Sequence, residues 1–159
     1  MQNPPLTLAF FPILISALAW SSPVLAEYTI HHVAGAARIS TSLPQGVQFG
    51  MSRREMKAWV QLGNEAGEGC YESEELAGRY ADLSTDLYIV YCFIGDEFVA
   101  KKSTIFGPLG PHTMALVYRW YGEPIHVESM DYLYWQRPES RLRLRVPAPF
   151  MVGYELVAR

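Results

Sequence analysis

One pattern occurs twice in this chain and restricts its fold more than any other feature: a short helix that ends at a glycine and is followed by strands. The first copy is expected within Gly50–Gly63. Ser52 is a suitable N-cap because its hydroxyl can accept from the first-turn amides, and Glu55 completes a capping box. Met51 and Met56 occupy the positions of a hydrophobic staple. The pattern therefore predicts a helix that starts at residue 53.

The first expected helix has one apolar side and a defined end. Met56, Trp59 and Val60 fall on one face, which predicts a buried stripe. Gly63 is then the expected stop. Segment 64–69 is rich in Gly and Glu, so we expect a loop there.

The second expected helix spans His112–Tyr121. Apolar or small residues at helical spacing predict one buried face, made of Thr113, Leu116, Val117 and Trp120. Gly122 ends this helix, and Pro124 prevents it from resuming.

Strand patterns fill most of the remaining chain. Segment 86–94 is apolar on both faces, which is typical of a central strand, and Gly95-Asp96 is a hairpin signal that returns the chain as strand 97–106. Further strands are expected at 28–33, with an extended piece at 38–41, at 70–72, at 125–135 as one strand, at 141–146 and at 151–157, with Leu142, Leu144, Val146, Val152, Tyr154 and Leu156 inward.

These patterns predict an α+β fold: an antiparallel sheet with short helices packed on one face. The similar order in the two halves favours two tandem helix-plus-strands units, residues 47–106 and 110–158. The alternative stays open that the halves share only a pattern, because their sequence identity is poor.

The first 26 residues differ from the rest because they carry no charged side chain. Their apolar run 6–20 is followed by small residues at Val24 and Ala26, which predicts a signal peptide, residues 1–26, and an exported domain, residues 27–159, in the periplasm or secreted. The alternative is an uncleaved membrane anchor. The run is shorter than the ~20 residues that a spanning helix needs, so we expect no stable membrane span after signal cleavage.

The two cysteines, Cys70 and Cys92, both lie in the expected exported domain. Oxidising compartments favour a disulfide between them, and its loop would stabilise the fold by about 3 kcal/mol. Two separate buried thiols are the alternative.

Composition and motifs argue against several functions. A net charge of −3 does not suit nucleic-acid binding. His31 and His32 are adjacent, so on a strand they would point to opposite faces and could not share a metal. The chain contains no catalytic or phosphate-binding motif that we recognise. We therefore expect no enzyme activity, no metal and no cofactor.

The candidate partner-binding residues lie near the C-terminus. Arg141, Arg143 and Arg145 alternate along one strand and so share a face, where guanidinium groups can bind phosphate or carboxylate. The alternative is a solvated row that pairs with Glu128 or Glu155.

An aromatic row precedes these arginines. Met130, Tyr132 and Tyr134 share one face of their expected strand, and tyrosine is common at interfaces. Packing of this face under a helix is the alternative. We assign Tyr132 and Tyr134 to partner binding together with the arginine row.

The segment Phe49–Met56 with Leu62-Gly63 resembles the start of the SmpA/OmlA (BamE-like) family of bacterial envelope proteins, in which a Gly-Met-Ser/Thr turn caps a helix ending in Leu-Gly. Segment Trp120–Pro124 resembles the helix end of a second copy, and tandem copies are the architecture of the β-lactamase inhibitory proteins. The chain departs from the family in having Asn64-Glu65 where proline is expected, and in lacking a lipid-bearing cysteine after the signal peptide.

The resemblance implies an exported, non-enzymatic binding or scaffolding module of the bacterial cell envelope that acts through a protein or an anionic partner. The alternative is a small envelope enzyme, or a carrier of a small ligand, with its site between helices and sheet. Perturbed carboxylates in a deep pocket would favour the alternative, and a broad arginine or aromatic face would favour binding of a protein.

Overall fold

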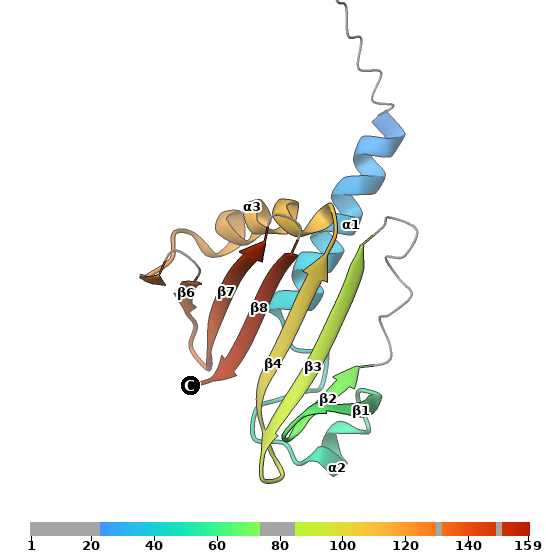
Figure 1. Cartoon of the computed structure of the whole chain (residues 1–159), viewed down its shortest axis with the longest axis vertical. Coiled ribbons are helices and arrows are strands. Elements are labelled where there is room, and N and C mark those ends of the chain that lie inside the picture. Colours follow the sequence, from blue (N-terminus) through green and yellow to red (C-terminus); the bar gives the residue numbers. More distant parts are fainter. Residues whose placement is uncertain (1–22, 74–84, 130–131, 149–150) are drawn as a thin grey trace, which may run out of the picture.

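The computed structural model describes residues 23–73, 85–129, 132–148 and 151–159. These residues form one eight-stranded antiparallel sheet and three helices, which confirms the expected α+β class (Figure 1). In chain order the elements are α1 (Pro23–Thr41), α2 (Arg53–Met56), β1 (Leu62–Gly67), β2 (Cys70–Ser73), β3 (Asp86–Ile94), β4 (Glu97–Phe106), α3 (Leu109–Tyr121), β5 (His126–Ser129), β6 (Tyr132–Gln136), β7 (Ser140–Ala148) and β8 (Met151–Ala158). No helix in these ranges is long and apolar enough to cross a bilayer.

The strand order is β1-β2-β3-β4-β8-β7-β6-β5. Each half of the chain forms a four-stranded meander, and the last strands of the two halves, β4 and β8, pair at the centre. Two tandem units joined through their final strands would give this order. Whether units 47–106 and 110–158 are true repeats stays a prediction.

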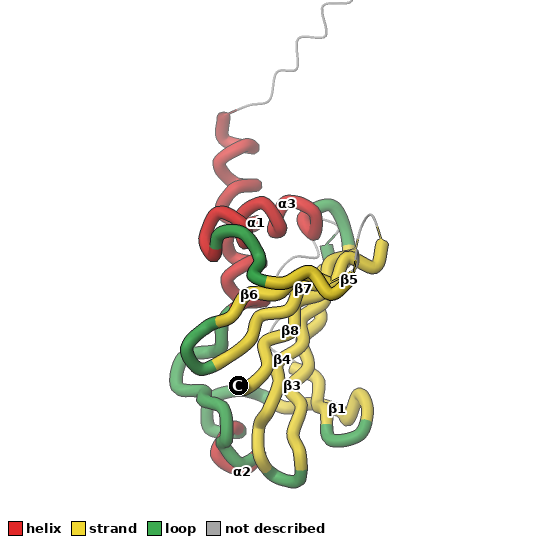
Figure 2. The backbone as a smooth tube through the Cα atoms, turned by 90° about the vertical axis from the view of Figure 1, so that its left-hand side faces the viewer, coloured by secondary structure: helices red, strands yellow, loops and turns green. Residues whose placement is uncertain are grey.

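The main hydrophobic core lies between the sheet and the helices. In Figure 1, α1 passes behind the sheet, and α3 lies across its upper end. The buried side chains of this core come from all three helices, from five of the strands and from two loop positions, among them Val33, Val117, Ile89, Phe98, Leu144 and Tyr154. The opposite face of the sheet carries none of the described helices (Figures 1 and 2).

The interior strand β3 is buried on both faces, as its composition predicts. Ile89, Tyr91 and Phe93 of β3 face the main core. Val90 and Cys92 alternate with them and join a smaller cluster on the opposite face.

Several other local predictions are also confirmed. The Gly95-Asp96 turn connects β3 to β4. α3 ends at Gly122, which has the positive φ that favours glycine, 75°. α3 starts at Leu109, three residues before the expected start, and the last strand buries Val152, Tyr154 and Leu156 as expected. The side chain of Val146 lies outside the described residues.

The strand expected at 28–33 and the extended piece at 38–41 are wrong, because both lie within the 19-residue helix α1. The buried residues of α1 do follow helical spacing, at Val33, Ala36, Ala37 and Ser40. Most of them are small, so their periodicity produces a weak hydrophobic signal. The small side chains let α1 pack closely against its neighbours. The buried face of α1 can therefore be identified only from this packing.

The first expected helix is much shorter than predicted. Its capping box is confirmed, but α2 ends at Met56, and Gly63 lies inside β1. The expected loop at 64–69 is therefore wrong for residues 64–67, which belong to β1, and is confirmed only for the turn at 68–69. Residues 62–67 pair with β2, and this pairing provides backbone hydrogen bonds that a longer helix would exclude.

Two tryptophans that were expected to be buried are partly exposed. Trp59 is 51% exposed, and its ring lies close to Gly46. Trp120 projects from α3, and the guanidinium of Arg38 lies 5.8 Å from its ring centroid.

The single strand expected at 125–135 is wrong. The structure has two antiparallel strands, β5 and β6, with His126 opposite Tyr134. By folding back, the chain provides β5 with a hydrogen-bonded partner, which one continuous strand would lack. Met130, part of the expected aromatic row, lies outside the described residues.

Candidate functional site

The three candidate arginines lie on the side of the sheet that is opposite to α1 and α3. In β7, Leu142 and Leu144 are fully buried in the main core, so the residues that alternate with them project from the other face. These residues are Arg141, Arg143 and Arg145, of which Arg141 and Arg145 are exposed. The alternation in the sequence thus predicts both the buried and the exposed side of this strand correctly.

The two candidate tyrosines lie on the adjacent strand and on the same face. Tyr132 is paired with Arg145, and Tyr134 is paired with Arg143. The packing alternative, a helix over these rings, is not found within the described residues, where the helices pack on the other face. We call the surface made by these five residues, Arg141, Arg143, Arg145, Tyr132 and Tyr134, the arginine–tyrosine face.

Cation–π contacts hold the arginine–tyrosine face together. The guanidinium groups of Arg143 and Arg145 lie 5.0 and 5.7 Å from the ring centroid of Tyr132. The guanidinium of Arg141 lies 5.9 Å from the ring centroid of Tyr134. Each ring attracts a cation through its negative face, so the long arginine side chains are partly ordered before any partner binds.

One carboxylate, Glu155 of β8, interacts with this face. It forms an ion pair with Arg143, directly across from it in the sheet, and its other oxygen lies 3.7 Å from Nζ of Lys102. Pairing with Glu155 is therefore confirmed for Arg143. The side chain of Glu128 lies outside the described residues.

The environment of Arg143 differs from that of its neighbours. Partial burial acts to lower its pKa, but hydrogen bonds to Tyr134 and Glu155 and the charge of Glu155 outweigh it and raise the pKa above the ordinary value. Within the described part of the chain, neither Arg141 nor Arg145 forms an ion pair.

Two shallow hollows flank Arg143 on this face. One, of about 350 Å³, is lined by Tyr134, Arg141, Glu155 and neighbouring residues. The other, of about 200 Å³, is lined by Tyr132, Arg145 and Lys102 among others. The described lining of the two hollows includes the cations Arg141, Arg143, Arg145 and Lys102, besides the carboxylate of Glu155.

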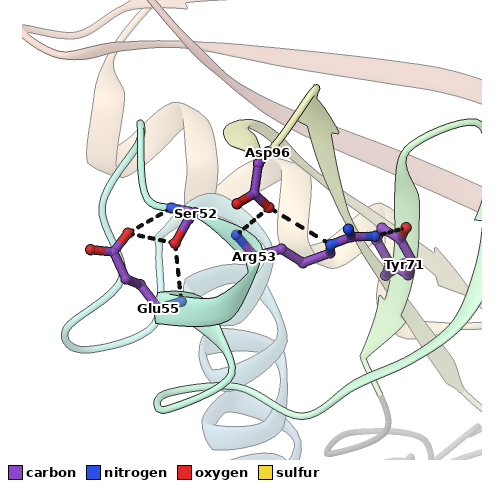
Figure 3. Close-up of polar contacts among 5 residues, drawn as sticks. All are labelled: Ser52, Arg53, Glu55, Tyr71 and Asp96. Carbon is purple, nitrogen blue, oxygen red and sulfur yellow. Dashed lines mark hydrogen bonds and ion pairs between the residues drawn. The ribbon is translucent and has the colours of Figure 1, made fainter.

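A second polar cluster surrounds the start of α2 (Figure 3). Oγ of Ser52 accepts from the amide of Glu55 at 3.2 Å, and the Ser52 amide donates to Oε2 of Glu55 at 2.8 Å. Hydrogen bonds from the backbone and side chain of Ser52 lower the pKa of Glu55. Arg53 extends away from this pair, between Asp96 and Tyr71.

The expected disulfide between Cys70 and Cys92 is confirmed. These residues are directly opposite each other in the β2–β3 pair, and the bridge belongs to the smaller hydrophobic cluster with Val90 and Ala100. The disulfide thus joins the outer β1–β2 hairpin of the sheet to the adjacent interior strand, β3.

Lys101 is a buried cation that the sequence reasoning missed. It is only 1% exposed, and its Nζ donates to the carbonyls of Ile39 and, at 2.7 Å, of Ser42, at the end of α1. Burial lowers its pKa to about 7. The alternation along β4 could have indicated that Lys101 is buried. Lys101 lies two residues before Ser103 and four before Ile105, and both of these residues face the core.

No group of three His, Cys, Asp or Glu side chains in the described ranges is arranged to hold a metal ion. His31 and His32, considered above as strand neighbours, are consecutive residues of α1.

Searches against protein families, curated proteins and solved structures found no match to this chain. The resemblance to the SmpA/OmlA family and to the β-lactamase inhibitory proteins therefore stays a prediction from the sequence.

Proposed function

We propose that this chain is an exported, non-enzymatic binding module of the bacterial cell envelope, and that it binds an anionic partner through the arginine–tyrosine face. The observation that carries the proposal is the gathering of three arginines and two tyrosines on the sheet face opposite the helices. The partner is an acidic protein surface or an envelope polyanion.

The charge balance of the face supports an anionic partner. Arg141 and Arg145 have no carboxylate partner among the described residues, whereas Arg143 is neutralised by Glu155. Guanidinium groups bind carboxylate or phosphate with two parallel hydrogen bonds. Alternate residues of a strand are about 6.8 Å apart, so the Cα atoms of Arg141 and Arg145 lie roughly 13 Å apart on the same face.

The tyrosines support a stable interface in addition to charge attraction. A tyrosine ring has only two rotatable side-chain bonds, so burying it loses little conformational entropy, and its hydroxyl can still hydrogen-bond. Because the rings already contact the arginines, less ordering is needed when the partner binds.

The test is a crosslinking capture from an envelope extract, with the chain from Glu27 as bait. We expect one partner whose capture decreases as salt increases, because exposed charges are screened. In the Arg141→Ser/Arg145→Ser variant, affinity should fall by about 100-fold or more, since each charge-assisted hydrogen bond contributes about 1.5–3 kcal/mol and the variant removes at least two. Arg143 is left intact so that Glu155 keeps its partner.

The matched control is Arg38→Ser/Arg119→Ser, which removes the same charge from exposed positions on α1 and α3. This control should capture the partner normally. Unchanged capture by the Arg141→Ser/Arg145→Ser variant would refute the proposed role of the face.

Export is tested separately by the mass of the protein recovered from its own cells. A chain that begins at Glu27 supports export with cleavage. A chain that retains residues 1–26 contradicts cleavage.

A further inference from the structure

The strongest unassigned feature is a cationic hollow beside α2, far along the sheet from the arginine–tyrosine face. It has a volume of about 520 Å³. Its lining combines three cations and one carboxylate with uncharged residues: Arg53, Arg54, Lys57, Asp96, Tyr71, Leu62 and Gly63. These residues come from α2 and its following turn, from β1 and β2, and from the β3–β4 turn.

Arg53 is held in place in this hollow. Its backbone amide donates to Oδ1 of Asp96 at 3.1 Å, and Nε lies 3.8 Å from the same oxygen. Nη1 donates to the hydroxyl of Tyr71, and the guanidinium lies 5.1 Å from the ring centroid of Tyr71 (Figure 3). These contacts orient the guanidinium, and within the described ranges no hydrogen bond or ion pair uses its Nη2.

Arg54 and Lys57 provide two further charges without a partner. Both are exposed, and neither forms an ion pair within the described ranges. They are three residues apart, one turn along the chain, so their like charges repel. An anion between them would relieve that repulsion.

The nearby carboxylates leave the hollow positive. Asp96 offsets one of the three cations, so the lining carries a net charge of +2. Glu55 is held by Ser52 and points away from Arg53 (Figure 3). A singly charged carboxylate would leave one cation uncompensated, whereas a phosphate monoester carries about −1.5 to −2 charges at neutral pH and offers three acceptor oxygens.

We propose that this hollow binds the phosphate group of a phosphate monoester, with Arg53 as the oriented donor and Arg54 and Lys57 as the additional cations. The site shares no residue with the arginine–tyrosine face, so it does not depend on the proposed function.

The experiment is a titration of the disulfide-bonded chain with inorganic phosphate, followed by NMR, at constant ionic strength maintained with chloride. We expect saturable shifts at the amides of residues 53–57, 71 and 96. The Arg54→Ser/Lys57→Ser variant, which leaves the capping box intact, should bind phosphate at least tenfold more weakly. Arg38→Ser/Arg119→Ser is the control of equal charge and should bind like the wild type.

Three outcomes would overturn the proposal: shifts that chloride reproduces, shifts that do not saturate, and equal affinity in the Arg54→Ser/Lys57→Ser variant with an otherwise native spectrum.

Two further probes identify whether the phosphate group belongs to a soluble ligand or to a lipid. Competition by glycerol phosphate indicates a soluble ligand. Binding to phosphatidylcholine vesicles that contain phosphatidic acid, lost in the Arg54→Ser/Lys57→Ser variant but kept in Arg141→Ser/Arg145→Ser, indicates a lipid headgroup. Either result supports a phosphate monoester.

Discussion

Ser52 defines the start of α2 through reciprocal hydrogen bonds with Glu55. A four-residue helix has few internal hydrogen bonds, so its N-terminal amides depend on this cap. The cap also positions Arg53, the next residue, toward Asp96 and Tyr71. Local capping chemistry and the proposed phosphate site are therefore linked at one residue.

We expect Ser52→Ala to lower the free energy of unfolding by about 1 kcal/mol, because the Glu55 amide loses its side-chain acceptor. Urea denaturation measures the change. Ser52→Thr keeps the hydroxyl and should stay close to the wild type. Equal stability of Ser52→Ala and Ser52→Thr would mean that the cap contributes nothing.

Lys101 connects β4 to the end of α1. Its ammonium group donates to two carbonyls near the C-terminus of that helix, where the helix dipole favours a cation. Burial nevertheless lowers its pKa to about 7, against about 10.5 in the unfolded chain. Between these values the unfolded chain binds more protons than the folded chain, so stability increases as pH rises.

We therefore expect the Lys101 contribution to the free energy of unfolding to increase from about pH 7 to about pH 10, by at most about 1.4 kcal/mol per pH unit. Above pH 10 the contribution of Tyr154 has the opposite sign, because burial raises its pKa and only the unfolded chain loses the proton readily. Urea denaturation at several pH values measures the profile. Lys101→Met should flatten the rise between pH 7 and 10, and an unchanged slope in this variant would contradict the assignment.

At the scale of single elements, β7 has core residues on one face and the candidate binding residues on the other. Leu142 and Leu144 are fully buried, and the arginines between and beside them project from the other face. The two sides of the strand can therefore be changed independently.

Leu144→Ala should lower the free energy of unfolding by about 2–5 kcal/mol, because it leaves a cavity in the main core. Arg145→Ala, one residue later, should change it by less than about 1 kcal/mol, since this exposed side chain contributes mainly a cation–π contact. Thermal or urea denaturation of both variants provides the comparison. Similar losses in the two variants would show that β7 does not alternate in this way.

The Cys70–Cys92 disulfide acts on the β2–β3 pair. The cysteines are 22 residues apart in sequence, so the bridge restricts the unfolded chain and should stabilise the fold by about 3 kcal/mol. Cys70→Ala/Cys92→Ala should show this loss in urea denaturation. Alkylation of unreduced protein should add no mass, and the addition of two groups would exclude the bridge.

At the scale of the whole molecule, the two halves share one sheet and one core. β4 and β8 pair from Ala100–Val157 to Phe106–Met151, and the main core contains buried residues from both halves. Neither half can therefore lose its structure without exposing apolar surface of the other.

We expect the two halves to unfold in a single transition. Trp59 and Trp135 lie in different halves, so tryptophan fluorescence reports on the unfolding of both. Far-UV circular dichroism and tryptophan fluorescence should therefore show the same urea midpoint. Val152→Ala at the β4–β8 junction should shift both probes together. Separate midpoints would indicate two independently folding units.

Much of the candidate site could be predicted from the sequence. Arginines and tyrosines at alternate positions share a face on any strand, whatever its partners are. That β6 and β7 are neighbours, and that their shared polar face is opposite the helices, depends on contacts across the sheet. The hollow beside α2 could not be predicted, because its lining comes from segments separated by up to 43 residues, as in the contact between Arg53 and Asp96.

By itself the sequence determined the capping box at Ser52, the hairpin at Gly95-Asp96 and the two sides of β7. These features depend on residues within a few positions of each other, where the backbone period sets the geometry. Only the tertiary structure decided that the small residues of α1 form a buried helix, that α2 ends at Met56, and that β4 pairs with β8. The reason is that weak local preferences are overruled when packing and strand pairing supply buried area and hydrogen bonds from distant segments.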